Sequence, residues 1–565
     1  MKLQMQISKT IQSLNTRQIY GMIVCVGLIL YGKSIFFDYT HMDDTHLLVV
    51  NQAFIGKIAN LPKLFTTDVF ISLATIHTYY RPLMNVLFML EAQVAQDNPL
   101  VYHMTNVLLH IGCSLLVFTL FQQLRLSKTL SALAALVFCV HPLHTSAVVW
   151  IPGRNDTLLT FFILSSFIFF LRAQETKRQS VSVLHILFFF FALLVKESAI
   201  VLPLLCLGYV YYAKGEKVQR SSLISLIAAY VFVLVVWIVM RTMVYHGFEV
   251  HNASSSLLVG FFSNLPAYFL YIGKVFVPMN LSIFPNLADH SLIPGIFCVL
   301  LFAGLLFVVQ PPSYKFIIWG ILWFFLFLSP SMVGEPVFYE HRAYCSMIGL
   351  LVSIVYLPAV EKMDFSRSIN VAGIVVLLLI LSLLTFFYEN SFRDRQRYAA
   401  SAYATAPSAD NSSTCLASLY LDERKYPEAE EVILAEIKRK PRVAAAHRIL
   451  GDIYAKRHEY DLAAREYELS LQFEPLGMIT YVRYGMMNLE IGQIDAAAHL
   501  WKTTIQINPD YLLGYYYLAN FYIHTKNDPD SAMIYVKQLQ QRGETVLPEL
   551  LNAIETHPLY LKKNQ

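Results

Sequence analysis

Charged residues are scarce in this chain. Of its 565 residues only 15% are Asp, Glu, Lys or Arg, and 56% are apolar, whereas a soluble globular chain is about 25% charged. The formal net charge of +4 is small for this length and gives no reason to expect a nucleic-acid partner. The composition excludes an ordinary soluble protein and, with many apolar stretches near the roughly 20 residues that cross a bilayer, predicts a polytopic membrane protein.

Several common site motifs are absent as well. The seven cysteines include no CxxC pair, so we expect neither a disulfide framework nor a zinc site. No GxGxxG or HExxH context supports a nucleotide or zinc enzyme. Residues 27–34 read GLILYGKS and match a phosphate-loop pattern, but they lie in a predicted membrane span, whereas a phosphate loop joins a strand to a helix in water.

The apolar segments predict an all-α fold with a helical membrane domain of about 11 spans. Basic residues precede the first span, which therefore reads as an uncleaved signal anchor with a cytoplasmic N-terminus. One further segment, 258–278, is ambiguous because it contains Asn264, Pro266 and Lys274. The predicted spans are 18–37, 100–122, 129–148, 157–172, 181–195, 197–213, 223–243, 293–309, 315–330, 341–359 and 370–389.

The distribution of basic residues predicts the topology. Cytoplasmic loops should carry the excess of Lys and Arg, which places loops 38–99 and 141–156 and the pair Lys196–Glu197 on the outer side. If 258–278 does not span, residues 340–342 and the C-terminal region are outside too; if it does, these later segments are inside. We favour the first arrangement because it gathers the polar motifs on one face.

The C-terminal region is repetitive. Prolines 407, 441, 475 and 509 are each 34 residues apart, and alanines 429, 463 and 497 keep the same period. A 34-residue period with these residue types resembles tetratricopeptide repeats, whose stacked helix pairs suit protein partners. We therefore predict a membrane domain over 1–397 and a repeat domain over 398–565, with three good repeats and a weaker fourth.

Ionisable residues gather in the predicted outer loops. Asp43 and Asp44 follow the first span; such a pair provides a general base for a hydroxyl nucleophile, with the second carboxylate positioning it or helping to hold a divalent cation such as Mg²⁺ or Mn²⁺. Arginine and lysine at the membrane boundary suit a phosphate. For each group there is also a structural interpretation, as a helix cap, an interface anchor or a self-neutralising pair. The remaining candidates are Arg81, His103, His141, His144, Arg154, Asp156, Lys196, Glu197, Glu340 and Arg342.

Taken in order, these segments resemble one family. The chain has the Asp pair, then YYRPL, YHMTNVLLH, HPLHTSAVVWIPGRND, LLVKESAIVLPLL, VPMNLSIFPN and EHRAY, followed by the repeats. This order is similar to that of the transmembrane and tetratricopeptide-repeat O-mannosyltransferases, which are integral-membrane glycosyltransferases of the GT-C type. The EHR element departs slightly from the family's usual ERR.

The resemblance implies an inverting enzyme that transfers a sugar, possibly mannose, from a polyprenyl-phosphate donor to protein Ser or Thr hydroxyls on the outer face of the membrane. Asp43 and Asp44 would be catalytic. Arg154, Lys196 and Arg342 would bind the donor phosphate, and the repeats would bind the acceptor protein. The short chain favours a bacterial inner-membrane protein with periplasmic repeats, or an endoplasmic reticulum protein with luminal repeats if the source is eukaryotic. The alternatives are a non-catalytic envelope scaffold and a lipid-linked-glycan polymerase or ligase.

Overall fold

The computed structural model describes residues 14–70, 79–215, 220–244, 253–308, 314–333, 338–365, 367–509, 511–541, 546 and 548–564. The chain forms two compact units. Unit 1 comprises Met1–Thr45, Leu61–Val69 and Thr78–Ala406; unit 2 comprises His46–Asn60, Phe70–His77 and Pro407–Gln565. The predicted boundary at residue 397 lies inside the last helix of unit 1.

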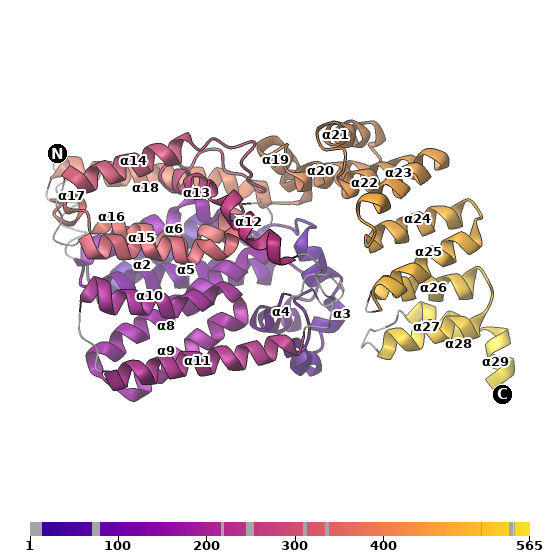
Figure 1. Ribbon diagram of the computed structural model, residues 1–565, viewed down its shortest axis with the longest axis horizontal. Helices are drawn as coiled ribbons and strands as arrows, with labels where there is room; N and C mark the ends of the chain where they lie inside the picture. Colours follow the sequence, from indigo (N-terminus) through magenta and orange to yellow (C-terminus); the bar gives the residue numbers. More distant parts are fainter. Residues whose placement is uncertain are drawn as a thin grey trace. The chain divides into compact units, whose positions relative to one another are not determined.

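Unit 1 is built of helices and connecting loops, with no strand in the described residues, and this confirms the predicted all-α fold. Its long helices run side by side (Figure 1). The α-helices of this unit, long and short, are α2 (Thr16–Tyr31), α4 (Pro82–Ala95), α5 (Leu100–Gln123), α6 (Lys128–Val140), α7 (Thr145–Val149), α8 (Arg154–Thr176), α9 (Gln179–Val195), α10 (Leu202–Gly208), α11 (Arg220–Thr242), α12 (Ala253–Asn264), α13 (Ala267–Phe276), α14 (Ile293–Val308), α15 (Tyr314–Leu328), α16 (Ser346–Val355), α17 (Pro358–Glu361), α18 (Ser368–Tyr388) and α19 (Arg395–Thr405).

Every predicted span coincides with helix in the described residues, but not every helix is long. Six are long and apolar enough to cross a membrane, and α6 with the helix after it makes a seventh candidate bent by 50°. Others, such as α9, α14 and α16, are apolar but shorter. The ambiguous segment 258–278 is broken between α12 and α13 at Leu265–Pro266, because proline removes a backbone donor and clashes with the preceding turn.

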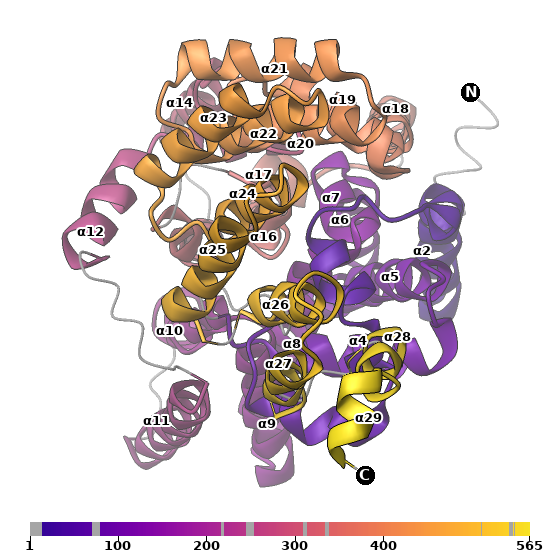
Figure 2. The same ribbon diagram turned by 90° about the vertical axis from the view of Figure 1, so that its right-hand side faces the viewer.

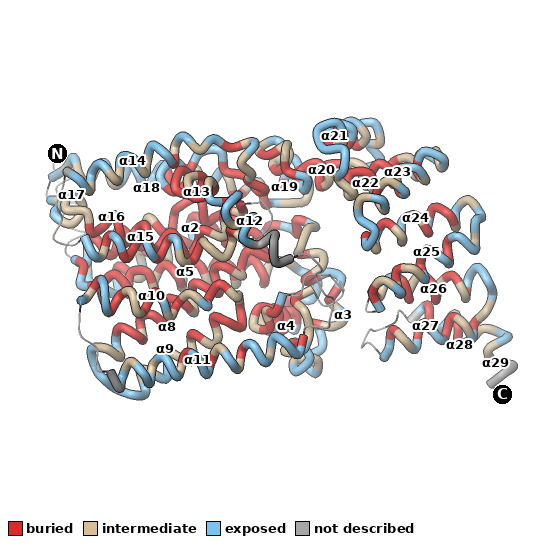
Figure 3. The backbone as a smooth tube through the Cα atoms, in the orientation of Figure 1, coloured by how far each residue is buried: buried red, intermediate tan, exposed pale blue. Residues whose placement is uncertain are grey.

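The outer surface of unit 1 is apolar. Phe232 of α11 is 69% exposed, Phe307 of α14 is 88% exposed and Ile369 of α18 is 74% exposed. Figure 3 shows α11 and α14 largely exposed, whereas α5 and α8 are largely buried. Large apolar side chains that face outward along whole helices indicate contact with lipid, because exposure of such a surface to water is unfavourable. The exposure pattern therefore supports a membrane protein.

Inside unit 1, small residues allow close helix packing. Helices α15 and α16 meet where Gly320 faces Gly349. A Cβ added at Gly320 would lie 2.4 Å from the Gly349 carbonyl oxygen, and one added at Gly349 would lie 2.3 Å from that of Gly320. Any larger residue at either position would clash with the facing backbone. Glycine therefore allows the close contact from which membrane helices gain much of their association energy.

Unit 2 contains four consecutive helix pairs followed by two short helices (Figure 2). The periodic alanines at 429, 463 and 497 are all fully buried between paired helices. In the fourth pair the equivalent buried residue is Ala532, one position beyond the 34-residue period, which explains the weaker signal of that repeat. The helices are α3 (Gln52–Ile55), α20 (Asp410–Asp422), α21 (Tyr426–Arg439), α22 (Ala444–Lys456), α23 (Tyr460–Phe473), α24 (Met478–Glu490), α25 (Ile494–Ile507), α26 (Leu512–His524), α27 (Pro529–Gln541), α28 (Pro548–Glu555) and α29 (Pro558–Asn564).

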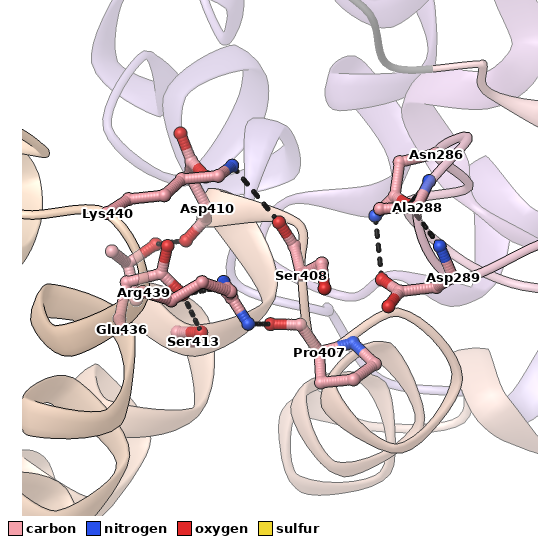
Figure 4. A network of polar contacts seen from close by, with 11 residues as sticks. Asn286, Ala288, Asp289, Pro407, Ser408, Asp410, Ser413, Glu436, Arg439 and Lys440 are labelled. Atoms are coloured by element: carbon pink, nitrogen blue, oxygen red, sulfur yellow. Dashed lines mark hydrogen bonds and ion pairs between the residues drawn. The ribbon is translucent and has the colours of Figure 1, made fainter.

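Side-chain bonds close the first repeat. Arg439 donates to the Pro407 carbonyl at 2.6 Å, and Ser413 donates to the Glu436 carboxylate at 2.7 Å (Figure 4). These bonds join the end of α21 to the start of the repeat, 32 residues earlier for Arg439 and 23 for Glu436. The close-up also includes a separate turn of unit 1, in which the Asn286 amide donates to Asp289 at 2.8 Å.

Candidate functional site

Five segments of unit 1 contribute the predicted site residues. They are the acid loop (residues 38–45, after α2), the residues before α4, the start of α8, the Lys196–Glu197 junction after α9 and the one-turn helix Glu340–Ala343. Hydrogen bonds, ion pairs and ring contacts connect all five, although they are distant in sequence. The contacts of each residue show which side chains are available for chemistry.

Asp44 holds the acid loop closed. Its Oδ2 accepts hydrogen bonds from the Thr40 backbone N–H at 2.6 Å and from the Thr40 hydroxyl at 3.0 Å. Its Oδ1 accepts from the backbone N–H groups of Met42 at 2.7 Å and Thr45 at 3.1 Å. A carboxylate has about four acceptor positions, so this buried side chain is fully used by the backbone around it. The geometry gives Asp44 a structural role in the loop.

Asp43 is different from its neighbour. Its side chain is partly exposed and accepts no hydrogen bond from a residue that the structure describes. Burial and, to a lesser extent, the nearby Asp44 charge raise the pKa of Asp43 to about 6, and Arg81 opposes the shift. A carboxyl group with a pKa near the working pH, and with unoccupied lone pairs, is suited to accept a proton from a hydroxyl.

Two adjacent residues at the α9 junction form ion pairs in different directions. The Lys196 ammonium lies 2.8 and 2.9 Å from the two carboxylate oxygens of Asp156 on α8. The Glu197 carboxylate lies 3.3 Å from the Arg81 guanidinium. Lys196 has an extended backbone, with φ −158° and ψ 137°, between the end of α9 and the following one-turn helix. This extended residue lets two consecutive side chains reach different partners.

Arg154 is fully enclosed. It pairs with the Glu91 carboxylate, and it donates to the Asn106 side-chain oxygen at 2.8 Å and to the Tyr102 carbonyl at 2.7 Å. Its guanidinium also lies 4.3 Å from the Phe88 ring centroid. Arg154 is 0% exposed, so it offers no surface to a donor phosphate. Its contacts instead join α8 to α4 and α5. The sequence signal for this pair is Glu91 itself, an isolated acidic residue in the apolar stretch 82–95.

Glu340 also has a buried cation as its partner. Its carboxylate accepts from the Lys274 ammonium at 2.6 Å and from the Ser282 backbone N–H at 2.8 Å. Lys274 lies in the ambiguous segment 258–278, after its proline break, and Ser282 lies just beyond that segment. The pair therefore attaches the 340–343 helix to α13 and the loop after it.

Arg342 and His341 lie among aromatic side chains. The Arg342 guanidinium is 4.9 Å from the Tyr339 ring centroid and donates to the Ser331 carbonyl at 3.4 Å. The His341 ring stacks on Tyr339 at 5.1 Å and lies 5.6 Å from Trp150. Sequence reasoning did not single out Trp150 or Tyr339, because aromatic residues are common throughout this chain.

Trp150 connects the acid loop to this aromatic group. Its indole N–H donates to the Thr40 hydroxyl at 3.2 Å, and Thr40 in turn bonds Asp44. The charges of Lys196, Arg342 and Arg81 all act on the His341 imidazole. His341 is thus within electrostatic range of three cations contributed by three separate segments.

The other predicted histidines are buried and have structural contacts. His141 accepts from the Leu143 backbone N–H at 3.2 Å through Nδ1, so Nε2 carries the proton and donates to the Val275 carbonyl at 2.9 Å. His144 packs against Tyr344 at 4.5 Å between ring centroids. His103 is buried, and its ring lies nearly perpendicular to that of Phe37, with 6.5 Å between the centroids. None of these contacts brings the three histidines to Asp43.

A divalent cation fits the acid loop poorly. Among the described residues, no group of three or more His, Cys, Asp or Glu side chains is arranged to hold a metal ion. Asp44 already receives four hydrogen bonds, and Asp156 and Glu197 each face a cation. We therefore derive no chemical step through a metal ion.

Two kinds of comparison connect this chain to known proteins. A tetratricopeptide-repeat family model matches residues 416–475. The human protein O-mannosyl-transferase TMTC1 is 29% identical over 216 residues, 36% of this chain and 24% of the relative. TMTC3 of Mus musculus is 31% identical over 201 residues, 34% of this chain and 22% of the relative. A Caenorhabditis elegans protein O-mannosyl-transferase, F38B6.6, is 27% identical over 235 residues, 40% of this chain and 32% of the relative.

These relatives confirm the predicted family resemblance and the repeats. The matched region spans about a quarter to a third of the length of these curated relatives.

Proposed function

We propose that this chain is an integral-membrane glycosyltransferase that transfers a sugar, mannose by analogy with the named relatives, from a polyprenyl-phosphate carrier to Ser or Thr hydroxyls of proteins. The observation that carries the proposal is the arrangement around the acid loop. One carboxylate, Asp43, has a raised pKa and accepts no hydrogen bond from a described residue. The charges of Arg81, Lys196 and Arg342 all act on His341, whose ring lies 5.6 Å from Trp150, the residue that bonds the acid loop.

The proposed reaction is a single displacement. Asp43 accepts the proton of the acceptor hydroxyl as its oxygen forms a bond to the anomeric carbon. The bond between that carbon and the phosphate oxygen breaks, and the polyprenyl phosphate leaves with its electron pair. Arg342, Lys196 and Arg81 stabilise the charge that develops on the leaving phosphate. Attack from the face opposite the leaving group inverts the anomeric configuration.

The remaining charged residues hold these groups in place. Asp156 orients the Lys196 ammonium, Glu197 orients Arg81, and Asp44 shapes the loop that carries Asp43. Arg154 and Glu340 act at greater depth, as partners in buried pairs that fasten α8 and the 340–343 helix. We therefore assign Arg154 to the support of the site rather than to the donor phosphate.

The lipid-linked donor explains where the site lies. The acid loop begins directly after the first long apolar helix, which ends at Phe36. A polyprenyl chain stays in the bilayer while its phosphate reaches the interface, so the cations are needed at that depth. We place this face outside the cytoplasm, in a bacterial inner membrane, with the repeats on the same side.

Two other functions remain as alternatives. A scaffold would use the repeats alone and has no need for a raised-pKa carboxylate in the loop after the first span. A lipid-linked-glycan polymerase or ligase would use the same membrane chemistry but has no need for a protein-binding repeat array.

Deletion of the gene tests the function in cells. We expect mass spectrometry of envelope proteins to find hexose on Ser or Thr residues in wild-type cells, loss of that hexose on deletion, and its return with the intact gene. Complementation with the Asp43→Asn variant is the control. Unchanged envelope glycoproteins, together with altered lipid-linked glycans, would favour the polymerase or ligase instead.

A further inference from the structure

The repeat array has one face made of the first helices of its pairs. Helix α22 packs against both α20 and α24, and each of the three is the first helix of its repeat. Figure 2 shows α22 beside α20 and α24. Side chains on this face from consecutive repeats are therefore close enough to act on one ligand.

Two arginines from different repeats share one carboxylate on these helices. Arg448 of α22 donates to Asp452 Oδ2 at 3.2 Å. The Nε of Arg483, on α24, lies 4.0 Å from the same oxygen. The Tyr467 hydroxyl donates to the other oxygen of Asp452 at 2.7 Å. Two guanidinium groups thus face a single acid, which leaves one positive charge in excess.

The excess charge is accessible on Arg483. Its side chain is 46% exposed, whereas the Asp452 side chain is only 9% exposed. Arg483 donates no hydrogen bond to any residue that the structure describes, so its planar N–H fork is available. A guanidinium with free donors beside a second guanidinium favours a carboxylate, which two N–H groups bind in parallel.

The surroundings favour a polypeptide as the carrier of that carboxylate. Met486 lies one helical turn after Arg483 and is 37% exposed, so the two side chains share a face of α24. Tyr511, at the start of the next repeat, is buried within electrostatic range of both arginines and contributes to the core beneath them. An acidic side chain with an apolar neighbour would match both the guanidinium groups and the exposed Met486.

We propose that Arg483 and Arg448 form a binding site for an acidic side chain of the acceptor polypeptide. This site rests on the proposed function, since it specifies the chemistry of the protein that receives the sugar. Acceptor segments would carry an Asp or Glu near the Ser or Thr to be modified. The site recognises the segment and takes no part in sugar transfer.

The test compares two fluorescein-labelled peptides on the full-length protein in phosphatidylcholine nanodiscs at low salt. Both peptides contain Ser, Thr, Ala and Leu; one carries two Glu residues and the other carries Gln at the same positions. We expect the Glu peptide to bind about tenfold more tightly, as befits charge-assisted bonds at a partly exposed site. Fluorescence anisotropy measures both dissociation constants.

Three variants show whether the preference arises at this site. Arg483→Gln should abolish it while leaving the Arg448–Asp452 pair and the fold intact. Arg465→Gln removes an exposed arginine on α23 and should retain the preference for the Glu peptide. Asp43→Asn should retain this preference as well. Equal binding of the two peptides by the wild type, or equal loss of preference in Arg483→Gln and Arg465→Gln, overturns the proposal. A preserved Glu preference without sugar transfer supports this site and overturns the proposed function instead.

Discussion

Replacement of Asp43 by Asn is expected to reduce sugar transfer by about 10²–10⁴-fold, the usual effect of removing a general base. The variant should fold and insert normally, because Asp43 accepts no hydrogen bond from a described residue and an amide fits the same space. Initial transfer rates at matched amounts of folded protein measure the effect. Normal turnover in this variant would exclude Asp43 as the base.

The acid loop offers a matched control. Asp38 lies in the same loop and is exposed. Among the residues that the structure describes, its carboxylate accepts a hydrogen bond only from the next residue's backbone N–H, at 2.7 Å. Asp38→Asn should leave transfer near the wild-type rate. A similar loss in both variants would show that the loop requires negative charge in general rather than a base at Asp43.

The pH profile gives a second readout for Asp43. The base must be ionised to accept a proton, and burial raises the pKa of this carboxyl to about 6. Transfer should therefore be constant above that pH and fall about tenfold per pH unit below it. Asp43→Asn should remove this acidic limb from the residual activity, whereas a limb that persists would belong to another group.

Breaking the Glu91–Arg154 pair is expected to produce the largest loss of stability. Arg154→Met or Glu91→Leu alone leaves one charge buried without its partner, which costs about 3–5 kcal/mol. The double variant should be more stable than either single variant, because apolar side chains then fill the space with no uncompensated charge. Thermal unfolding of the detergent-solubilised protein measures the three differences.

The exposed pair Arg125–Glu175 provides the comparison. Its side chains are 82% and 47% exposed and lie 3.9 Å apart, so Arg125→Met should change the unfolding temperature little. Wild-type stability in Arg154→Met would contradict the structural role. If the double variant folds but no longer binds the lipid-linked donor, Arg154 binds the donor phosphate, as the sequence predicted.

Local patterns in the sequence were sufficient to predict the two kinds of helical architecture, the apolar helices and the repeats. The 34-residue period marks small residues that each helix pair must bury, so it predicts the repeats without any long-range contact. The apolar segments likewise identify helices, since a bilayer imposes both length and composition. Helix length was less predictable: at 265–266 a proline ends a helix inside an apolar segment, and hydropathy alone does not record that.

The pairing of charges could not be predicted in the same way. Glu91 and Arg154 are 63 residues apart, and Lys274 and Glu340 are 66 apart, so only the packing of helices brings them together. The difference between Asp43 and Asp44 is equally invisible in sequence. It arises because the loop's backbone N–H groups point at one carboxylate and not at its neighbour.

Sugar transfer by the reconstituted protein is the most direct test of the proposed inverting glycosyltransferase. The purified chain in lipid vesicles is supplied with a polyprenyl-phosphate mannose of defined anomeric configuration and a Ser/Thr peptide, and the product is analysed by mass spectrometry and NMR. We expect one added hexose on a hydroxyl, with the anomeric configuration opposite to that of the donor. A product with retained configuration, or no hexose from folded wild-type protein, would contradict it.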